Sequence, residues 1–429
     1  MKLSKTTLLA VILALVHLGL ALAYSSVTPY RQAGVLKFQG GASSQDIGAP
    51  DERQHVNYIG HIIDRGLPVF DPEDENLYET YQFHQPPLFY WLGQGWCEFV
   101  FKVDPREASS KLAVRSLNSI IGALGVLGIF CLGLWASNRQ SVGLASAAFA
   151  GLLPMNLALS GAVSNDPLLI CLSAWALAFM VRGLRYGWSF GWALVCGLTI
   201  GLALVTKSSA IALLFPALIT LIASLPKNKL VLIALPAAIG PPIALWARNF
   251  QLYGDPLAMN VFTKAFVGTA QAADFIRELG PFGYWTGINQ FGLGVGWWTA
   301  RSFLGAFGYM DIFYPSWLVG VFWLLLIVGL VFALAKPVTD ESKKVRLAMF
   351  VFGLSVLALF LRFNAQYFQA QARYLFPALP VIAVGFAFGW SRILGRRHAF
   401  LPWILIGGLV LLNIVTLTWL GDEFAMRVR

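Results

Sequence analysis

Charged residues are scarce in this sequence. Only 12% of its 429 residues are Asp, Glu, Lys or Arg, whereas 57% are hydrophobic and the mean hydropathy is +0.67. A soluble domain carries about 25% charged residues. This composition cannot cover a surface that faces water, but it suits a chain that is solvated by lipid. The sequence therefore predicts a multispanning membrane protein.

Several familiar signals are also missing. The four cysteines, Cys97, Cys131, Cys171 and Cys196, show neither a disulfide framework nor the spacing of a metal site. There is no glycine-rich nucleotide fingerprint and no Walker motif. No linker rich in Pro, Ser or Gly and no low-complexity run divides the chain. We therefore expect a single transmembrane bundle domain over residues 1–429, with an all-α polytopic fold.

Long apolar runs, in contrast, are abundant. The first, residues 6–23, has 18 residues, which form about 27 Å of helix, close to the thickness of the hydrocarbon core. Its basic start and its Ala21-Leu22-Ala23 end also fit a cleaved signal peptide, although we favour a retained helix. Both interpretations place the next loop outside. About eleven transmembrane helices are predicted, the other ten near residues 112–135, 140–160, 166–182, 187–206, 209–225, 229–247, 315–335, 345–361, 374–391 and 399–420.

The distribution of charge predicts which side each connection faces. The net charge is +10, and we attribute it to the positive-inside rule rather than to a nucleic-acid partner. With the N-terminus inside, only Asp340 and Glu341 of the 21 acidic residues face inward, and twelve acids lie between Asp46 and Glu107. The basic residues predicted on the inner side are Lys2, Lys5, Arg139, Arg182, Arg185, Lys227, Lys229, Lys336, Lys343, Lys344, Arg346, Arg392, Arg396 and Arg397.

Two outer loops are long, at residues 24–110 and 248–314. Within the first loop, two segments have helical patterns, residues 51–66 and 86–101, the second of which opens with a double proline that suits a first helical turn. We interpret both as amphipathic helices that lie on the outer leaflet, separated by a solvated acidic turn at residues 71–79. The apolar side of the first segment consists of Val56, Ile59, Ile62 and Ile63.

Asp51 is the leading candidate for chemistry. It stands at a helix start with Gln54 three residues later, which is the pattern of a capping box. A carboxylate at the rim of a bundle can also face a cavity, so the sequence leaves a cap and a general base open. Glu52 points to a different side of the helix, as a solvated acid favoured by the helix dipole or as a substrate ligand.

Other polar candidates stand at the outer ends of spans. Asp166 is followed by a proline and fits an N-cap, but an acid at the apolar edge is costly unless it is paired or wet. It could face Asp51 across the mouth of one cavity. The basic candidates are either interfacial anchors or cations that hold a phosphate. They are Lys207, Arg248, Arg373 and Arg115.

Histidines gather in the first loop. A divalent metal held by His55, His84 and an acid is conceivable, but no tight ligand spacing supports it. The sequence therefore leaves the metal ligands unknown and establishes no cofactor.

The order of these motifs resembles a known family. The Asp-Glu pair after one span is followed by Pro86-Pro87-Leu88-Phe89-Tyr90-Trp91-Leu92, Arg115-Ser116-Leu117-Asn118-Ser119, Asn165-Asp166-Pro167-Leu168-Leu169, Thr206-Lys207-Ser208, Arg248-Asn249 with Tyr253-Gly254-Asp255-Pro256, and Arg373-Tyr374-Leu375-Phe376-Pro377. This set resembles the GT-C superfamily, the integral-membrane glycosyltransferases that use polyprenyl-phosphate sugars. The bacterial protein-mannosyltransferase-like and aminoarabinose lipid A transferase-like members look most similar.

The resemblance implies a bundle with amphipathic helices in the first outer loop and a cavity open to the outer leaflet. It also implies Asp51 as general base and Asp166 as a second catalytic acid. The implied substrate-binding residues are Glu52, His55, His84, Lys207, Arg248, Arg373 and Tyr374. The chain departs from relatives at His84-Gln85, where an acid-Lys pair is common, and at Ser208, where glycine is common. It is also short, without a large C-terminal soluble domain.

The predicted activity is inverting transfer of a monosaccharide from a polyprenyl-phosphate donor to an acceptor, at the outer face of a bacterial cytoplasmic membrane. The implied partners are this donor, membrane lipids and an acceptor that is a protein, a lipid or a glycan. A transporter or flippase of a lipid-linked sugar is the alternative. Transporters usually place ionisable residues near the bilayer midplane, whereas here they crowd the rim.

Overall fold

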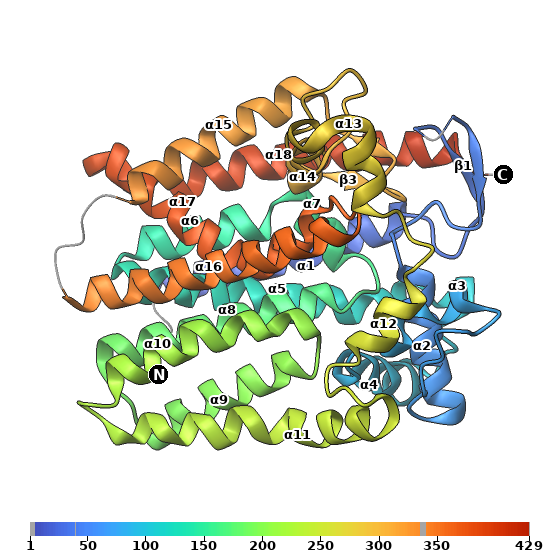
Figure 1. The fold of residues 1–429 in the computed structure, drawn as a ribbon. Coiled ribbons are helices and arrows are strands. Elements are labelled where there is room, and N and C mark those ends of the chain that lie inside the picture. Colours follow the sequence, from blue (N-terminus) through green and yellow to red (C-terminus); the bar gives the residue numbers. More distant parts are fainter. Residues whose placement is uncertain (1–4, 39, 335–339, 429) are drawn as a thin grey trace.

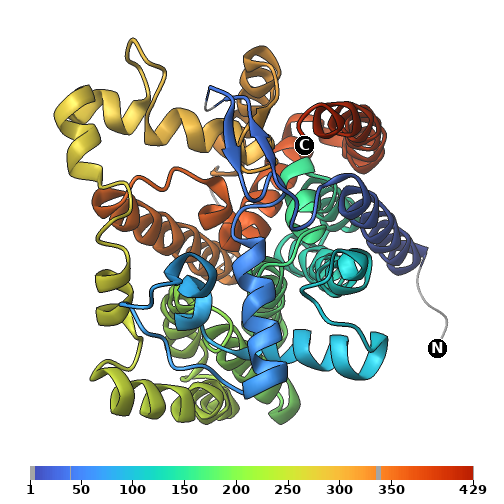
Figure 2. The ribbon, with the colours of Figure 1, turned by 90° about the vertical axis from the view of Figure 1, so that its right-hand side faces the viewer.

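The computed structural model describes residues 5–38, 40–334 and 340–428, so Lys2 and Lys336 of the predicted inner side lie outside it. Its long helices run side by side across Figure 1, and many short elements of the two long loops gather at the right-hand end. We call this end, formed by residues 28–107 and 254–315, the loop end. Figure 2 looks at the loop end, with α2 in blue near its centre and the yellow second-loop helices along one side.

All eleven predicted segments contain helix. By length and composition, eight helices of the described residues could cross a membrane, and the pair α6 and α7, bent by 66°, could form a ninth. The helices α9 (Phe190–Leu204) and α10 (Leu214–Ser224) are shorter. The multi-pass helical fold is confirmed, whereas a count of eleven complete spans is not. The eight candidate spans contain α1 (Lys5–Val27), α5 (Lys111–Ser137), α8 (Asp166–Tyr186), α11 (Ala234–Tyr253), α15 (Ser316–Ala333), α16 (Asp340–Gln366), α17 (Leu379–Ile393) and α18 (Leu401–Ala425). Of these, α17 reaches a spanning length only together with residues 372–378 before it.

Small residues allow the closest helix contacts. A Cβ atom on Gly389 of α17 would lie 1.7 Å from the carbonyl oxygen of Gly329 in α15. The two helices therefore touch backbone to backbone, as small residues permit in membrane bundles.

The helix α6 (Gln140–Gly151) is followed by α7 (Pro154–Ser160). The irregular backbone after α7 is hydrogen-bonded by polar side chains of neighbouring helices. Asn118 Nδ2 donates to the carbonyls of Ala162 (2.6 Å) and Ser164 (2.7 Å), and Ser25 Oγ donates to the carbonyl of Gly161 (2.8 Å). Irregular backbone inside a membrane protein requires such partners. The turn that leads into Asp166 is thereby fixed.

The first loop contains the predicted amphipathic helices. The helix α2 (Glu52–Arg65) buries Val56, Ile59 and Ile62, as its pattern predicts. It packs against α4 (Leu88–Gly95), which continues into the π-helical turn η2 (Trp96–Phe101). Their position on the outer leaflet stays a prediction.

The acidic segment between them is less solvated than the sequence predicts. Leu77–Thr80 forms the short helix α3, and Tyr81–His84 forms the 3₁₀ helix η1. The Glu79 carboxylate accepts hydrogen bonds from Arg53 Nε (3.0 Å) and Asn57 Nδ2 (2.5 Å). A solvated turn over the whole of residues 71–79 is therefore wrong, because Glu79 pairs with one cation and one amide side chain of α2.

The second loop and the C-terminal segment meet the first loop at one clasp. The buried carboxylate of Asp311 pairs with Arg427 and accepts from the backbone amides of Lys37 (2.8 Å) and Phe38 (2.6 Å). A β-bridge also joins Gly34 to Val428.

The remaining elements are the hairpins β1 (Gly34–Leu36) with β2 (Ala42–Ser44) and β3 (Ala306–Phe307) with β4 (Ile312–Phe313), the helices α12 (Met259–Ala265), α13 (Ala272–Thr286) and α14 (Val295–Leu304), and the short helices η3 (Ala108–Ser110), η4 (Ser208–Leu213), η5 (Lys229–Ile233), η6 (Ala372–Ala378) and η7 (Gly395–Phe400).

One buried ion pair fixes the start of α2. Arg115, fully buried in α5, donates from Nε and Nη2 to the two carboxylate oxygens of Glu52 at 2.8 and 2.6 Å. Its other donors reach the carbonyls of Ser25, Thr28 and Pro29, each at 2.8 Å. All five N–H groups of the guanidinium are therefore used. Glu52 is only 4% exposed, so its prediction as a solvated acid is wrong: the cation beside it compensates its burial.

Replacement of Glu52 by glutamine should destabilise the fold. Arg115 would stay buried without its counterion, at a cost of about 3–5 kcal/mol. We expect a clearly lower melting temperature of the purified protein in detergent, and a smaller loss in the double variant Glu52→Gln/Arg115→Met than the sum of the single losses. The exposed Glu73→Gln is the control. Equal melting temperatures of Glu52→Gln and the control would contradict this interpretation.

Candidate functional site

Asp51 does not cap the helix that it precedes. Its backbone is left-handed, with φ 62° and ψ −1°, and its carboxylate makes no capping hydrogen bond. This conformation is unfavourable for a residue other than glycine and is common at functional sites. The carboxylate instead accepts from Tyr81 at Oδ1 and from the Arg373 guanidinium at Oδ2. The predicted capping box is therefore wrong, because distant partners hold the side chain.

The Asp51 carboxyl is a strong acid in this setting. Burial by itself would raise its pKa, but the charge of Arg373 and the Tyr81 hydroxyl lower the pKa to about 2. Charge compensation therefore outweighs desolvation. Asp51 is an anion at every physiological pH, and in this arrangement it is a weak base.

A second ion pair lies beside the first. Lys207 Nζ is 2.5 Å from Oδ1 of the buried Asp166, which leads α8. Both cations lie against the Tyr374 ring, with the Lys207 ammonium 5.7 Å and the Arg373 guanidinium 5.2 Å from its centroid. Four predicted residues from four separate turns are thus gathered around one aromatic ring.

Arg373 keeps unused hydrogen-bonding capacity. It stands in η6, is buried, and its Nε atom has no hydrogen-bond partner among the residues that the structure describes. Buried donors normally have partners, and exceptions call for an explanation. A ligand anion would provide one.

Two of the three first-loop histidines, the predicted ligands His55 and His84, have partners within the protein. His55 Nδ1 lies 2.9 Å from the Tyr90 hydroxyl, and His84 Nδ1 lies 2.5 Å from the carbonyl oxygen of Tyr81. Burial lowers the pKa of His55 to about 3 and that of His84 to about 4. Both imidazoles are therefore neutral at pH 7. His55 is close enough to both ion pairs to be affected by their charges.

Two residues predicted to bind substrate, Glu52 and Arg248, are bound to other parts of the protein. Glu52 is bound to Arg115 and also accepts from the backbone amide of Val163 (2.8 Å). Arg248 donates from Nη2 to the carbonyl of Pro68 (2.6 Å), which ties α11 to the first loop. The structure does not join either side chain to the two ion pairs by a hydrogen bond.

The described side chains do not fit a metal ion. In residues 5–38, 40–334 and 340–428, no group of three or more His, Cys, Asp or Glu side chains could hold one. His84 lies instead beside Gln85, with their Nε2 atoms 3.0 Å apart. We therefore derive no metal-dependent step.

The tyrosines around Asp51 carry no signal in the sequence. Tyr81 lies 30 residues away along the chain, and Tyr309 lies in the β3–β4 turn of the second loop. Burial and the Asp51 charge raise the pKa of both phenols. No spacing rule links such residues to Asp51, because only the packing of the two loops brings them together.

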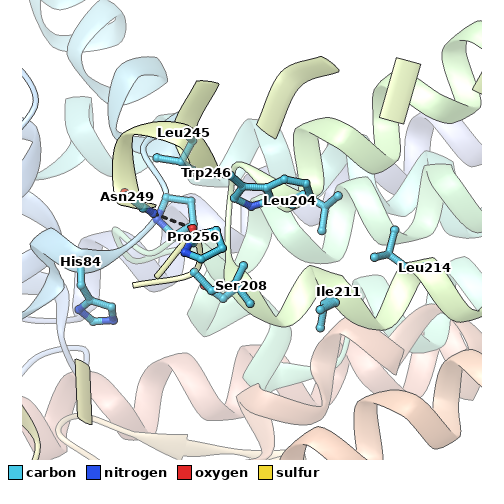
Figure 3. A pocket seen from close by; sticks show the side chains of 11 residues that line it. His84, Leu204, Ser208, Ile211, Leu214, Leu245, Trp246, Asn249 and Pro256 are labelled. Carbon is cyan, nitrogen blue, oxygen red and sulfur yellow. Dashed lines mark hydrogen bonds between the residues drawn. The ribbon is translucent and has the colours of Figure 1, made fainter. Parts of the chain in front are cut away.

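An apolar cavity of about 250 Å³ adjoins the site (Figure 3). Its polar lining includes His84, Asn249 and Ser208, and Ser208 is next to Lys207 in the chain. It extends between η4 and α11 toward Ile211 and Leu214 (Figure 3). The remaining lining residues are Pro86, Leu204, Leu245, Trp246, Pro256 and Leu257.

Comparisons with known proteins support a family resemblance. The family model described as dolichyl-phosphate-mannose-protein mannosyltransferase matches residues 84–246, which include Asp166 and Lys207. No curated protein matches the chain.

Among solved structures, ArnT from Cupriavidus metallidurans bound to undecaprenyl phosphate is similar, with a TM-score of 0.51 and 17% identity over 89% of this chain and 60% of that one. The Archaeoglobus fulgidus oligosaccharyltransferase tethered with an acceptor peptide has a TM-score of 0.53 and 16% identity over 96% of this chain and 55% of that one. The chain thus spans less than two thirds of the length of these structures. At such identities the likeness shows a shared fold.

Removal of the Arg373 charge should raise the pKa of Asp51. In Arg373→Met the anion loses its counterion while burial still disfavours it, so the pKa should rise from about 2 to about 4 or above. The carboxyl group would then take up its proton at a higher pH. Carbon-13 NMR of protein labelled at aspartate carboxyls measures this, with the Asp51 signal assigned through Asp51→Asn. Arg248→Met should leave the value unchanged, and an unchanged value in Arg373→Met would contradict the pairing.

Proposed function

We propose, from the membership of this chain in the GT-C superfamily of integral-membrane glycosyltransferases, that it transfers a monosaccharide from a polyprenyl-phosphate donor to an acceptor. The superfamily placement rests on the family-model match and on the shared fold. The donor, the inverting course of the reaction and the residue roles below are our proposal.

One observation carries the proposal. Two carboxylate–cation pairs share the Tyr374 ring, directly beside an apolar cavity. A general base must reach the proton that it removes, and a phosphate leaving group needs fixed cations for its developing charge. The arrangement supplies both without a nucleotide site.

In the proposed reaction, Asp51 is the general base. An acceptor hydroxyl or amine attacks the anomeric carbon from the face opposite the phosphate and forms the new glycosidic bond. The proton of the acceptor hydroxyl or amine passes to Asp51. The bond between the anomeric carbon and the phosphate oxygen breaks, and its electron pair stays on the phosphate. The configuration at the anomeric carbon is inverted.

Donor binding would make Asp51 a better base. The phosphate competes with Asp51 for Arg373, whose free Nε donor already favours an anion. As Arg373 turns to the phosphate, the charge that holds the pKa of Asp51 near 2 is shared. The carboxylate therefore becomes more basic when a donor is present.

The remaining candidates have separate proposed roles. Lys207 and Tyr374 bind the phosphate together with Arg373. Asp166 and the neutral His55 face the donor sugar or the acceptor. Glu52 and Arg248 are not included, since their partners are in the protein.

The cavity beside Lys207 would hold the first isoprene units of the donor. It is lined mainly by Leu, Ile, Trp and Pro side chains, and one of its polar lining residues, His84, belongs to the loop end. With the charge distribution of the inner connections, this end faces the outside of a bacterial cytoplasmic membrane. Membrane lipids and a protein, lipid or glycan acceptor complete the partners.

Asp51→Asn should abolish transfer. Loss of a general base typically reduces the rate by about 10²–10⁴-fold. The assay uses the purified protein in detergent with a radiolabelled polyprenyl-phosphate sugar and measures labelled acceptor. Asp64→Asn, an exposed change on the same helix, should transfer normally.

Two outcomes would overturn this assignment. Normal transfer by a folded Asp51→Asn protein would exclude Asp51 as the base. Movement of the labelled donor across a reconstituted bilayer without product, by the unchanged protein, would favour a flippase.

Filling the cavity should weaken donor binding. Ile211→Trp places a large ring where the lipid would lie, and the loss of two or three buried CH₂ contacts corresponds to about a tenfold or larger increase in donor KM. The rate at saturating donor should change less. Leu218→Trp, on the exposed face of α10, is the matched control. An unchanged donor KM in Ile211→Trp would place the lipid elsewhere.

A further inference from the structure

We propose that Tyr81 is the positioning residue of the Asp51 base: it holds Oδ1 throughout the reaction, while Oδ2 is released by Arg373 and receives the acceptor proton. This inference rests on the proposed function above. It assigns a role to a first-loop tyrosine for which the sequence offers no motif.

The hydroxyl of Tyr81 is aimed at Asp51 by its surroundings. It donates to Asp51 Oδ1 and lies 3.4 Å from Gln54 Oε1. Gln54 is itself fixed, because its Nε2 donates to the carbonyl of Tyr78 at 2.8 Å. The phenol therefore has two acceptors for its one proton, and the charged carboxylate is the stronger acceptor.

Both loops hold the Tyr81 ring in place. Tyr81 begins η1, and its carbonyl oxygen lies 2.5 Å from His84 Nδ1. The ring also packs perpendicular to Phe266 of the second loop, with centroids 6.0 Å apart at 90°. Phe262 packs on His84 at 5.0 Å. A rigid phenol is what a positioning contact requires.

Asp51 needs such a contact. Its left-handed backbone gives the side chain no capping bond, so its orientation depends on Tyr81 and Arg373. When Arg373 turns to the donor phosphate, Tyr81 is the side-chain partner that remains. Because Oδ2 is the oxygen that faces Arg373, it is left open on the side where the phosphate and its sugar lie.

Tyr81 acts as a donor and not as an acid in this role. Burial and the charge of Asp51 raise the pKa of its phenol, so the proton stays on the oxygen. The other groups near Asp51 are His55 of α2, Tyr90 of α4, Tyr309 of the β3–β4 turn, Arg373 and Tyr374 of η6, and the Asp166–Lys207 pair. His55 has a pKa of about 3, and the pKa values of Tyr90 and Tyr309 are raised, so none of these three changes charge between about pH 4 and 9.

Tyr81→Phe tests the proposal, since it keeps the ring and removes only the hydroxyl. Loss of a hydrogen bond to a charged group should lower kcat by about ten- to a hundredfold, with donor KM changed less than about twofold. The hydroxyl favours the ionised carboxylate, so its removal should raise the pKa of Asp51 and move the acid limb of kcat up by about one pH unit. The control is Tyr186→Phe, because Tyr186 is exposed at the end of α8 that is far from Asp166. Its kcat and pH profile should match those of the unchanged protein.

The readouts separate positioning from a merely structural role. An equal loss at every pH, together with a lower melting temperature, would show that Tyr81 only supports the fold and would overturn the inference. Normal kcat and an unmoved acid limb would overturn it as well.

A second measurement distinguishes failure of this inference from failure of the proposed function. Carbon-13 NMR of the Asp51 carboxyl without donor should show a raised pKa in Tyr81→Phe, whatever reaction the protein catalyses. A raised pKa with no transferase activity in any variant would retain the contact and reject the reaction. Full activity of Tyr81→Phe beside an inactive Asp51→Asn would reject the role of Tyr81 alone.

Discussion

The candidate site depends on the buried pair between Glu52 and Arg115. Arg115 uses all five of its donors, and they join the end of α1, the start of α2 and the body of α5. Glu52 in turn holds the amide of Val163, just ahead of the turn that carries Asp166. Both acids of the site are therefore positioned from one guanidinium, which touches neither of them by a hydrogen bond. The adjacent residues Asp51 and Glu52 thus have separate tasks: Glu52 fixes the fold, and Asp51 holds its carboxylate between Tyr81 and Arg373.

The charge balance of the site follows from this arrangement. Asp51 and Asp166 each have one cation. The nearby phenols of Tyr81, Tyr90 and Tyr309 have raised pKa values and stay uncharged, and the Tyr374 ring contacts Arg373. The pairs are nearly neutral without a ligand, which limits the cost of burying them. An arriving phosphate would find cations already desolvated and oriented, and so would need little reorganisation of the protein.

Much of this architecture could be predicted from the sequence, because hydropathy and helical spacing are local signals. They gave the multi-pass helical fold and the buried face of α2. The sequence also singled out Asp51, Asp166, Lys207 and Arg373, since charged residues at the ends of apolar spans must face water or a polar partner. The capping role of Asp51 and the solvation of Glu52 were wrong, because long-range partners overrode local preferences. Tyr81 and Tyr309 could not be found in this way, since only the contact between two loops gives them a role.

The clasp around Asp311 has a consequence for the order in which the protein matures. Lys37 and Phe38 are synthesised early, Asp311 much later, and Arg427 only after α18. The first loop therefore lacks these partners until the segment through Arg427 has been synthesised. Tyr309 lies in the same β3–β4 turn as Asp311, so the contacts of Asp311 with the first loop also hold the turn that brings Tyr309 near Asp51. A chain that ends before Asp311 and Arg427 thus lacks the ion pair that joins the first loop, the second loop and the C-terminal segment at the loop end.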